Sequence, residues 1–156
     1  MIGLIFSAYL IVLCSEATVV RQCQGDTKQL SDTDVSITNC KKDRCKLRKN
    51  TKVSIEMKLQ PERDIKKLTT TVNAIIGGIP LPFIGVDGTS ACNNLYLEDG
   101  ATKTHCPLKA GQNYVYKNSF DVLSIYPSIR QLDVHWSLVD GNNKKLTCFE
   151  LPARIL

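Results

Sequence analysis

The sequence has few of the residues from which metal sites and catalytic centres are built. It contains two histidines, His105 and His135, and none of its seven cysteines forms a Cys-x-x-Cys pair. The ligand spacings of zinc sites are therefore missing. His105 adjoins a cysteine, whereas His135 is out of phase with the apolar Trp136 and Leu138 and is expected to point to solvent. Because neither histidine stands in a pattern with a nucleophile, we expect no metal, no cofactor and no enzymatic activity.

Other absences bear on partners and on fold class. Aromatic residues make up 6% of the chain, and they are scarce among its clustered positive charges, which disfavours nucleic-acid binding. The sequence lacks an Asn-x-Ser/Thr acceptor, so we expect no N-linked glycan. No segment repeats at a fixed period or shows a sustained helical stripe, which argues against a solenoid and leaves strands as the main element.

The chain begins with an apolar segment. Its first fourteen residues carry no charged side chain, and Ser15-Glu16-Ala17 follows as a small-x-small tripeptide. This pattern is typical of a signal peptide, and we predict that residues 1–17 are removed. A buried core helix is the alternative. The apolar run is shorter than the roughly 20 residues that cross a bilayer, and no later stretch is long and apolar enough.

The remaining residues, 18–156, have the composition of one folded, basic and secreted domain. The whole chain has 156 residues, of which 43% are hydrophobic, and a net charge of +5. Loss of Cys14 with the leader leaves six cysteines for an oxidising compartment: Cys23, Cys40, Cys45, Cys92, Cys106 and Cys148. Spacing alone does not choose among their pairings. Local proximity favours Cys40 with Cys45 and Cys92 with Cys106, which leaves Cys23 to meet Cys148.

Apolar residues alternate with polar ones along several segments. The clearest run is Val53, Ile55, Met57 and Leu59, and the same period of two recurs in 35–37, 68–76 and 132–138. Further runs cover 114–122 and 146–155, and Gly- and Asn-rich turn signals separate the runs. This pattern predicts an all-β fold, an antiparallel sandwich of about seven strands.

Two proline-bearing segments are unusually apolar for surface loops. Residues 77–85 carry Ile79, Leu81, Phe83 and Ile84, and their two prolines are expected to prevent regular strand pairing. Residues 123–127 form a second apolar corner. We predict that the two segments form the rim of a pocket opening between the sheets, the alternative being two loops packed onto a solid core.

Several motifs, taken in order, are shared with a known family. They are Cys40 and Cys45 followed by Lys46-Leu47, then Gly78-Ile79-Pro80-Leu81-Pro82-Phe83, then Cys106-Pro107 with Gly111 and Tyr114–Lys117, then Tyr126-Pro127-Ser128-Ile129, Trp136-x-Leu138 and Cys148-Phe149-Glu150-Leu151-Pro152. The chain thereby resembles the secreted ML (MD-related lipid-recognition) domain family, and within it the Niemann-Pick type C-two proteins. The resemblance spans essentially the whole of residues 18–156.

The resemblance implies an immunoglobulin-like sandwich with the three disulfides named above and a hydrophobic tunnel between its sheets. It makes Phe83, Val122 and Tyr126 the gate of that tunnel. The walls that it implies are Ile37, Leu47, Val53, Ile55, Val72, Ile76, Leu81, Tyr116, Ile129, Leu132, Val134, Trp136 and Phe149.

The densest charge lies in residues 41–52, which hold seven positive residues and one negative residue. We predict that this segment docks on anionic membranes. The side chains concerned are Lys41, Lys42, Arg44, Lys46, Arg48 and Lys49. The alternative is a solvated disulfide loop beside an edge strand that lysines protect from pairing.

The resemblance implies a carrier for a sterol, a long-chain fatty acid or a hydrophobic signalling compound of the kind used in chemical communication. Such a carrier passes its ligand to membranes or to a receptor. Two alternatives remain: an innate-immunity module that binds lipopolysaccharide together with a receptor, and a solid sandwich with no ligand. Relatives that reach lysosomes by a mannose-phosphate tag need a glycan. We therefore expect extracellular fluid as the main location, with the lysosome second.

Overall fold

The computed structural model describes residues 18, 20–25, 30, 34–40 and 44–156. The predicted signal peptide lies outside the described residues. Within them are eleven strands and one short 3-10 turn, η1 (Ala91–Asn94). None of the described residues forms a helix long and apolar enough to cross a membrane.

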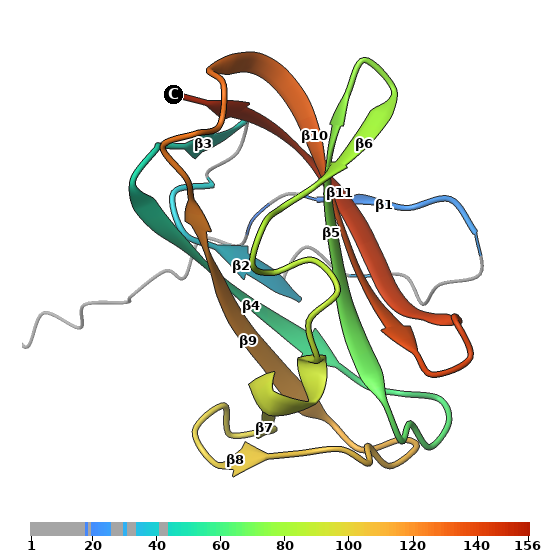
Figure 1. Cartoon of the computed structure of the whole chain (residues 1–156). Coiled ribbons are helices and arrows are strands. Elements are labelled where there is room, and N and C mark those ends of the chain that lie inside the picture. Colours follow the sequence, from blue (N-terminus) through green and yellow to red (C-terminus); the bar gives the residue numbers. More distant parts are fainter. Residues whose placement is uncertain (1–17, 19, 26–29, 31–33, 41–43) are drawn as a thin grey trace, which may run out of the picture.

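The strands form two sheets that face each other (Figure 1). The first has the order β1 (Arg21–Gln22), β11 (Lys145–Ile155), β10 (Ile129–Asp140), β5 (Leu68–Ile76) and β6 (Ile79–Pro82), with β3 (Cys45–Leu47) also paired to β11. The second has the order β2 (Val35–Ile37), β4 (Thr51–Leu59), β9 (Tyr114–Val122), β7 (Leu95–Leu97) and β8 (Lys103–Thr104). All pairs are antiparallel except β3 with β11. The predicted all-β sandwich is confirmed.

Strand alternation places the apolar side chains in one core between the sheets. Along β4, Val53, Ile55, Met57 and Leu59 are at most 4% exposed, whereas the residues between them face solvent. Trp136, at 1% exposure, is among the largest fully buried side chains and lies on β10. The six runs recognised in the sequence correspond to β2, β4, β5, β9, β10 and β11.

The expectation that the two prolines prevent pairing in residues 77–85 is wrong. Strand β6 pairs antiparallel with β5, and Pro80 and Pro82 lie opposite Ile75 and Asn73. Proline is tolerated here because β6 is an edge strand. The two prolines are two residues apart, so their backbone nitrogens both face away from β5, where no hydrogen bond to that strand is lost. The backbone N–H of Phe83, the residue after Pro82, faces β5 and donates to the Val72 carbonyl at 3.0 Å.

Three disulfides fasten the sandwich. They join Cys40 to Cys45 and Cys92 to Cys106, the two pairs that local proximity favours, and Cys23 to Cys148, the pair that remains. The Cys23–Cys148 bridge links the segment after β1 to the middle of β11. The Cys92–Cys106 bridge holds η1 against the segment after β8.

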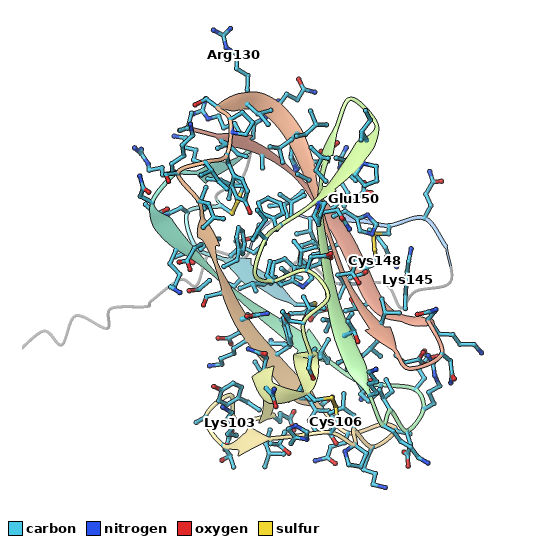
Figure 2. The ribbon with its side chains drawn as sticks, in the orientation of Figure 1. Lys103, Cys106, Arg130, Lys145, Cys148 and Glu150 are labelled. Carbon is cyan, nitrogen blue, oxygen red and sulfur yellow. A yellow bond between two sulfur atoms is a disulfide. The ribbon has the colours of Figure 1, made fainter. Side chains whose placement is uncertain are left out.

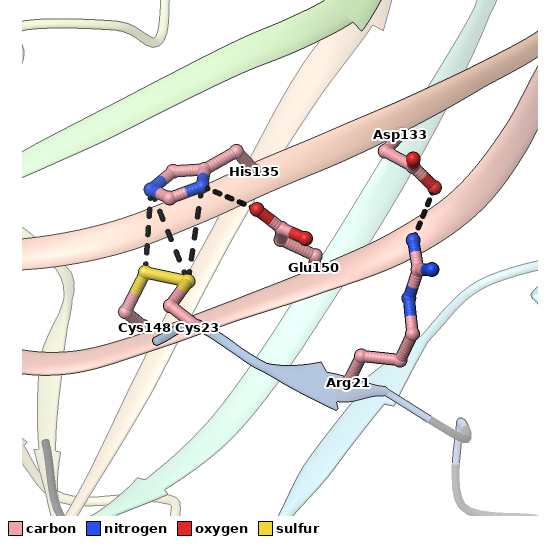
Figure 3. A network of polar contacts seen from close by, with 6 residues as sticks. All are labelled: Arg21, Cys23, Asp133, His135, Cys148 and Glu150. Atoms are coloured by element: carbon pink, nitrogen blue, oxygen red, sulfur yellow. Dashed lines mark hydrogen bonds and ion pairs between the residues drawn. A yellow bond between two sulfur atoms is a disulfide. The ribbon is translucent and has the colours of Figure 1, made fainter. Parts of the chain in front are cut away.

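His135 lies on the outer face of β10, as its phase predicts, but it does not extend freely into solvent. Its side chain is 22% exposed and covers the Cys23–Cys148 disulfide, with Nε2 at 3.2 Å from Cys148 Sγ. Nδ1 lies 3.1 Å from a Glu150 carboxylate oxygen, and Figure 3 marks this contact with a dashed line. Although these atoms cluster closely enough to suggest a metal site, both sulfurs are committed to the disulfide, and no thiolate is available as a ligand.

Candidate functional site

An apolar pocket of about 130 Å³ opens at one end of the sandwich. It lies at the end where β6 and the C-terminus are drawn in the upper part of Figure 1. The β5–β6 hairpin and the segment between β9 and β10 form it, so both proline-bearing segments contribute to its rim. Its lining residues are Ala74, Ile76, Leu81, Pro82, Phe83, Tyr126, Pro127, Ile129 and Ile155.

A tight hairpin turn sets the shape of this rim. Ile76 pairs with Ile79, so Gly77 and Gly78 alone connect β5 to β6. Both glycines have positive φ, 57° and 83°, which suits the two-residue turns that match strand twist and which other residues adopt at a cost. The turn leaves Ile79 63% exposed at the tip of the rim.

Phe83 and Tyr126 close the inner side of the pocket. The Phe83 side chain is only 3% exposed, and the Tyr126 ring meets it edge to face with the centroids 5.8 Å apart. The backbone N–H of Ile84 donates to the Tyr126 hydroxyl at 2.9 Å, which ties one rim segment to the other. Val122, the third predicted gate residue, is buried and does not line this pocket.

A row of aromatic rings leads from the gate into the core. Phe83 contacts Phe120 with ring centroids 5.2 Å apart, and Phe120 contacts Trp136 at 5.9 Å. Tyr116 follows, 6.4 Å from Trp136. Phe120 was missing from the predicted site, although it lies two residues before Val122 on the same strand face and the period of two was sufficient to identify it.

The space between the sheets is nearly filled in this structure. The inner cavity has a volume of about 10 Å³, which is close to the minimum for one water molecule. The tunnel that the resemblance implies is therefore not open between the described residues. The cavity is lined by Ile37, Cys45, Leu47, Val53, Ile55, Phe120, Val134, Trp136 and Leu151.

The predicted walls divide into three groups. Ile76, Leu81 and Ile129 line the outer pocket, with Leu81 49% exposed. Six more line the inner cavity, namely Ile37, Leu47, Val53, Ile55, Val134 and Trp136. The other four are buried in the surrounding core and line neither space: Val72, Tyr116, Leu132 and Phe149.

Part of the basic segment lies at the same end as the outer pocket. Lys49 donates its backbone N–H to the carbonyl of Leu156, the neighbour of the pocket residue Ile155. The Arg44 guanidinium donates to the Arg130 carbonyl at 3.1 Å, and Arg130 is labelled at this end in Figure 2. Lys46 and Arg48 are exposed. Lys41 and Lys42 lie outside the described residues.

The fold and the site define a class: an antiparallel sandwich with an apolar pocket at one end and an aromatic row leading from that pocket into its core. The chain belongs to the ML domain family, because the family model matches residues 17–155.

Two relatives illustrate the range of similarity. The chain is 35% identical over 111 residues to the ecdysteroid-regulated 16 kDa protein of Manduca sexta, covering 71% of this chain and 70% of that protein. It is 26% identical over 153 residues to NPC intracellular cholesterol transporter 2 homolog a of Drosophila melanogaster, covering 94% and 97%. A crystal structure of a Niemann-Pick type C2 protein from Japanese carpenter ant superposes with a TM-score of 0.71 at 24% identity, covering 88% of this chain and 99% of that one.

Proposed function

We propose that this protein is a secreted carrier that takes up an apolar ligand, a sterol, a fatty acid or a hydrophobic signalling compound, between its two sheets. The observation that carries the proposal is the continuous row of rings from the outer pocket past Phe83 and Phe120 to Trp136. The name of the Drosophila relative, a cholesterol transporter homolog, supports a ligand of this kind. The three disulfides are typical of chains folded in an oxidising compartment, which supports secretion.

Uptake requires the closed interior to open. None of the three disulfides joins the two rim segments, and we propose that these segments and the side chains of the gate move during uptake. The hydrogen bond from Ile84 to Tyr126 opposes opening by about 1 kcal/mol. Burial of roughly 300 Å² of apolar ligand surface contributes about 7 kcal/mol before the costs of binding. This gross contribution alone corresponds to a dissociation constant of about 10 μM, which the costs of binding weaken, and it involves no covalent chemistry.

Filling the outer pocket tests this proposal. Ala74 lines the pocket at 7% exposure. In Ala74→Phe the new ring is expected to occupy much of the pocket volume and to weaken the affinity for a fluorescent fatty acid by at least tenfold. Phe83→Asp is expected to act in the same direction by placing a charge at the gate. Ser54→Asp, on the outer face of β4, is the control and is expected to bind normally.

The identity of the ligand follows from extracting the purified protein with organic solvent. Recovery of a neutral sterol or a fatty acid supports the carrier, whereas lipid A together with a stable receptor complex supports the immune-recognition alternative. Unchanged binding in both Ala74→Phe and Phe83→Asp contradicts a ligand path through this pocket.

We further propose that the pocket end docks on anionic membranes during transfer. Ile79, Ile84 and Ile125 are 63%, 57% and 74% exposed around the pocket, and the basic side chains Arg44 and Lys49 lie at the same end. A basic residue near an anionic surface contributes about 1 kcal/mol. Arg44→Glu with Lys49→Glu is therefore expected to slow transfer to anionic vesicles by at least tenfold and to leave transfer to neutral vesicles unchanged.

Lys103→Glu is the matched control, because Lys103 is exposed on β8 at the opposite end of the molecule (Figure 2). Equal transfer rates for the double variant and the control contradict membrane docking and leave the binding proposal intact.

A further inference from the structure

A histidine lies against the Cys23–Cys148 disulfide on the outer face of the first sheet (Figure 3). His135 Nε2 lies 3.2 Å from Cys148 Sγ and 3.9 Å from Cys23 Sγ. Nδ1 lies 3.7 Å from Cys23 Sγ and 3.1 Å from a Glu150 carboxylate oxygen. Strand pairing sets this arrangement, because His135 on β10 lies directly opposite Glu150 on β11, two residues after Cys148.

Both ring nitrogens of His135 face atoms that carry no hydrogen. A disulfide sulfur has none to donate, and an ionised carboxylate only accepts. The geometry therefore suits the doubly protonated imidazolium, in which Nδ1–H donates to Glu150 and Nε2–H points toward Cys148 Sγ. Arg21 lies nearby and is paired with Asp133, so that pair adds no net charge beside the ring. A positive charge is thereby placed next to the Cys148 sulfur.

The two sulfurs of this bridge differ in how a reagent reaches them. Cys148 is 0% exposed in the middle of β11, whereas Cys23 is 7% exposed and directly precedes the exposed Gln24 and Gly25. Strand β1, which leads into Cys23, has two residues and lies at the edge of its sheet. Because short edge segments open locally at little cost in free energy, a reagent meets the Cys23 sulfur before the Cys148 sulfur.

We propose that Cys23–Cys148 is a thiol-exchange site, at which a small thiol attacks Cys23 and His135 protonates the leaving sulfur. The thiolate of the small thiol forms a new S–S bond with Cys23 Sγ and is oxidised. The Cys23–Cys148 bond breaks, its electron pair goes to Cys148 Sγ, and that sulfur takes the proton from His135 Nε2. The products are a mixed disulfide on Cys23, a thiol on Cys148 and a neutral imidazole. Exchange is faster when the leaving sulfur is stabilised in this way.

The Cys92–Cys106 bridge provides a comparison within the same chain. His105 adjoins Cys106, but its Nδ1 lies 3.1 Å from the Cys106 carbonyl oxygen and its Nε2 lies 3.0 Å from Asn93 Oδ1. Both nitrogens of His105 therefore face oxygen and not the disulfide. Exposure alone predicts that this bridge opens first, because Cys106 is partly exposed. The geometry at His135 predicts the reverse order.

The order in which the bridges open tests the proposal. The folded protein is treated with dithiothreitol, samples are quenched in acid, and the freed thiols are alkylated and located by peptide mapping. We expect Cys23 and Cys148 to be freed before Cys92 and Cys106. With glutathione in place of dithiothreitol, we expect the adduct on Cys23 and the alkylated thiol on Cys148.

Two substitutions separate the role of His135 from that of exposure. His135→Gln keeps a polar side chain but removes the positive charge, and it is expected to slow exchange at this bridge by at least about tenfold, the effect of losing a general acid. Glu150→Gln removes the acceptor of Nδ1 and is expected to slow the same reaction severalfold. Glu56→Gln is the matched control, because Glu56 is exposed on β4 in the other sheet, and it is expected to react normally.

A histidine that only shields the disulfide gives the opposite sign, because its removal exposes the sulfurs to attack. Equal or faster exchange in His135→Gln overturns the proposal, as does a glutathione adduct on Cys148. Earlier opening of Cys92–Cys106 in the unmodified protein also overturns it. None of these results bears on the carrier proposal.

Discussion

Asp140 shows how one buried side chain stabilises the connection between the two longest strands. It is 7% exposed at the end of β10 and accepts hydrogen bonds from the backbone N–H groups of Asn142 and Lys144 at 2.8 and 2.9 Å. Arg63 adds an ion pair at 2.6 Å. Arg63 and these backbone donors hold the Asp140 pKa below its usual value of 3.8 despite the opposing effect of burial.

A lowered pKa makes this residue a source of acid sensitivity. The carboxylate contributes stability above its unfolded pKa, and the contribution disappears as the pH falls through the lower folded pKa. We predict that Asp140→Asn lowers the free energy of unfolding at neutral pH by roughly 1 to 3 kcal/mol. Denaturant titrations are expected to show this difference shrinking at strongly acidic pH, whereas a difference that stays constant contradicts the assignment.

Asp121→Asn is the matched control for this experiment. Asp121 pairs with Lys52, but both side chains are more than 60% exposed. Exposed ion pairs contribute little, so we expect a change below about 1 kcal/mol at any pH.

At the scale of elements, the sequence predicts the long strands β4, β5, β9, β10 and β11 and the short β2, and it misses the short β1, β3, β7 and β8. β4, β5 and β10 are long enough to show a period of two, whereas β1, β7 and β8 have two or three residues and carry no periodicity. The two prolines of β6 argue against a strand in the sequence. They are tolerated because β6 lies at the edge of its sheet, and the segment alone does not reveal an edge position.

The same distinction separates the predicted site from the observed one. Alternation placed Trp136 and Val134 inward, and the apolar character of residues 77–85 indicated the rim. The alternation of apolar and polar residues is the same for a filled core and a hollow one. It therefore does not predict that the inner cavity has a volume of only about 10 Å³.

The disulfides differ in the length of chain that they close. Cys23 and Cys148 are 125 residues apart, whereas Cys40 and Cys45 are 5 apart. Because a disulfide restricts the unfolded chain more when it closes a longer loop, the Cys23–Cys148 bridge is expected to contribute about 3 kcal/mol more to the free energy of unfolding. We predict that Cys23→Ser with Cys148→Ser lowers the free energy of unfolding substantially more than Cys40→Ser with Cys45→Ser, as measured by denaturant titration. Equal losses contradict the loop-length argument.

At the scale of the whole molecule, the pocket, the exposed isoleucines and part of the basic segment share one end of the sandwich. η1, β7 and β8 lie toward the opposite end, where the Cys92–Cys106 bridge holds the chain. We propose that the ligand enters at the end that carries the outer pocket, through the rim, past Phe83 and along the rings toward Trp136.

Quenching of Trp136 fluorescence by a brominated fatty acid or sterol tests the route most directly. Trp136 is the single tryptophan and is 1% exposed, so a bromine atom reaches it only when the ligand lies between the sheets. We predict strong quenching that saturates at one ligand per protein and that Ala74→Phe prevents. Saturable binding of the brominated ligand with unquenched Trp136 emission contradicts a site between the sheets.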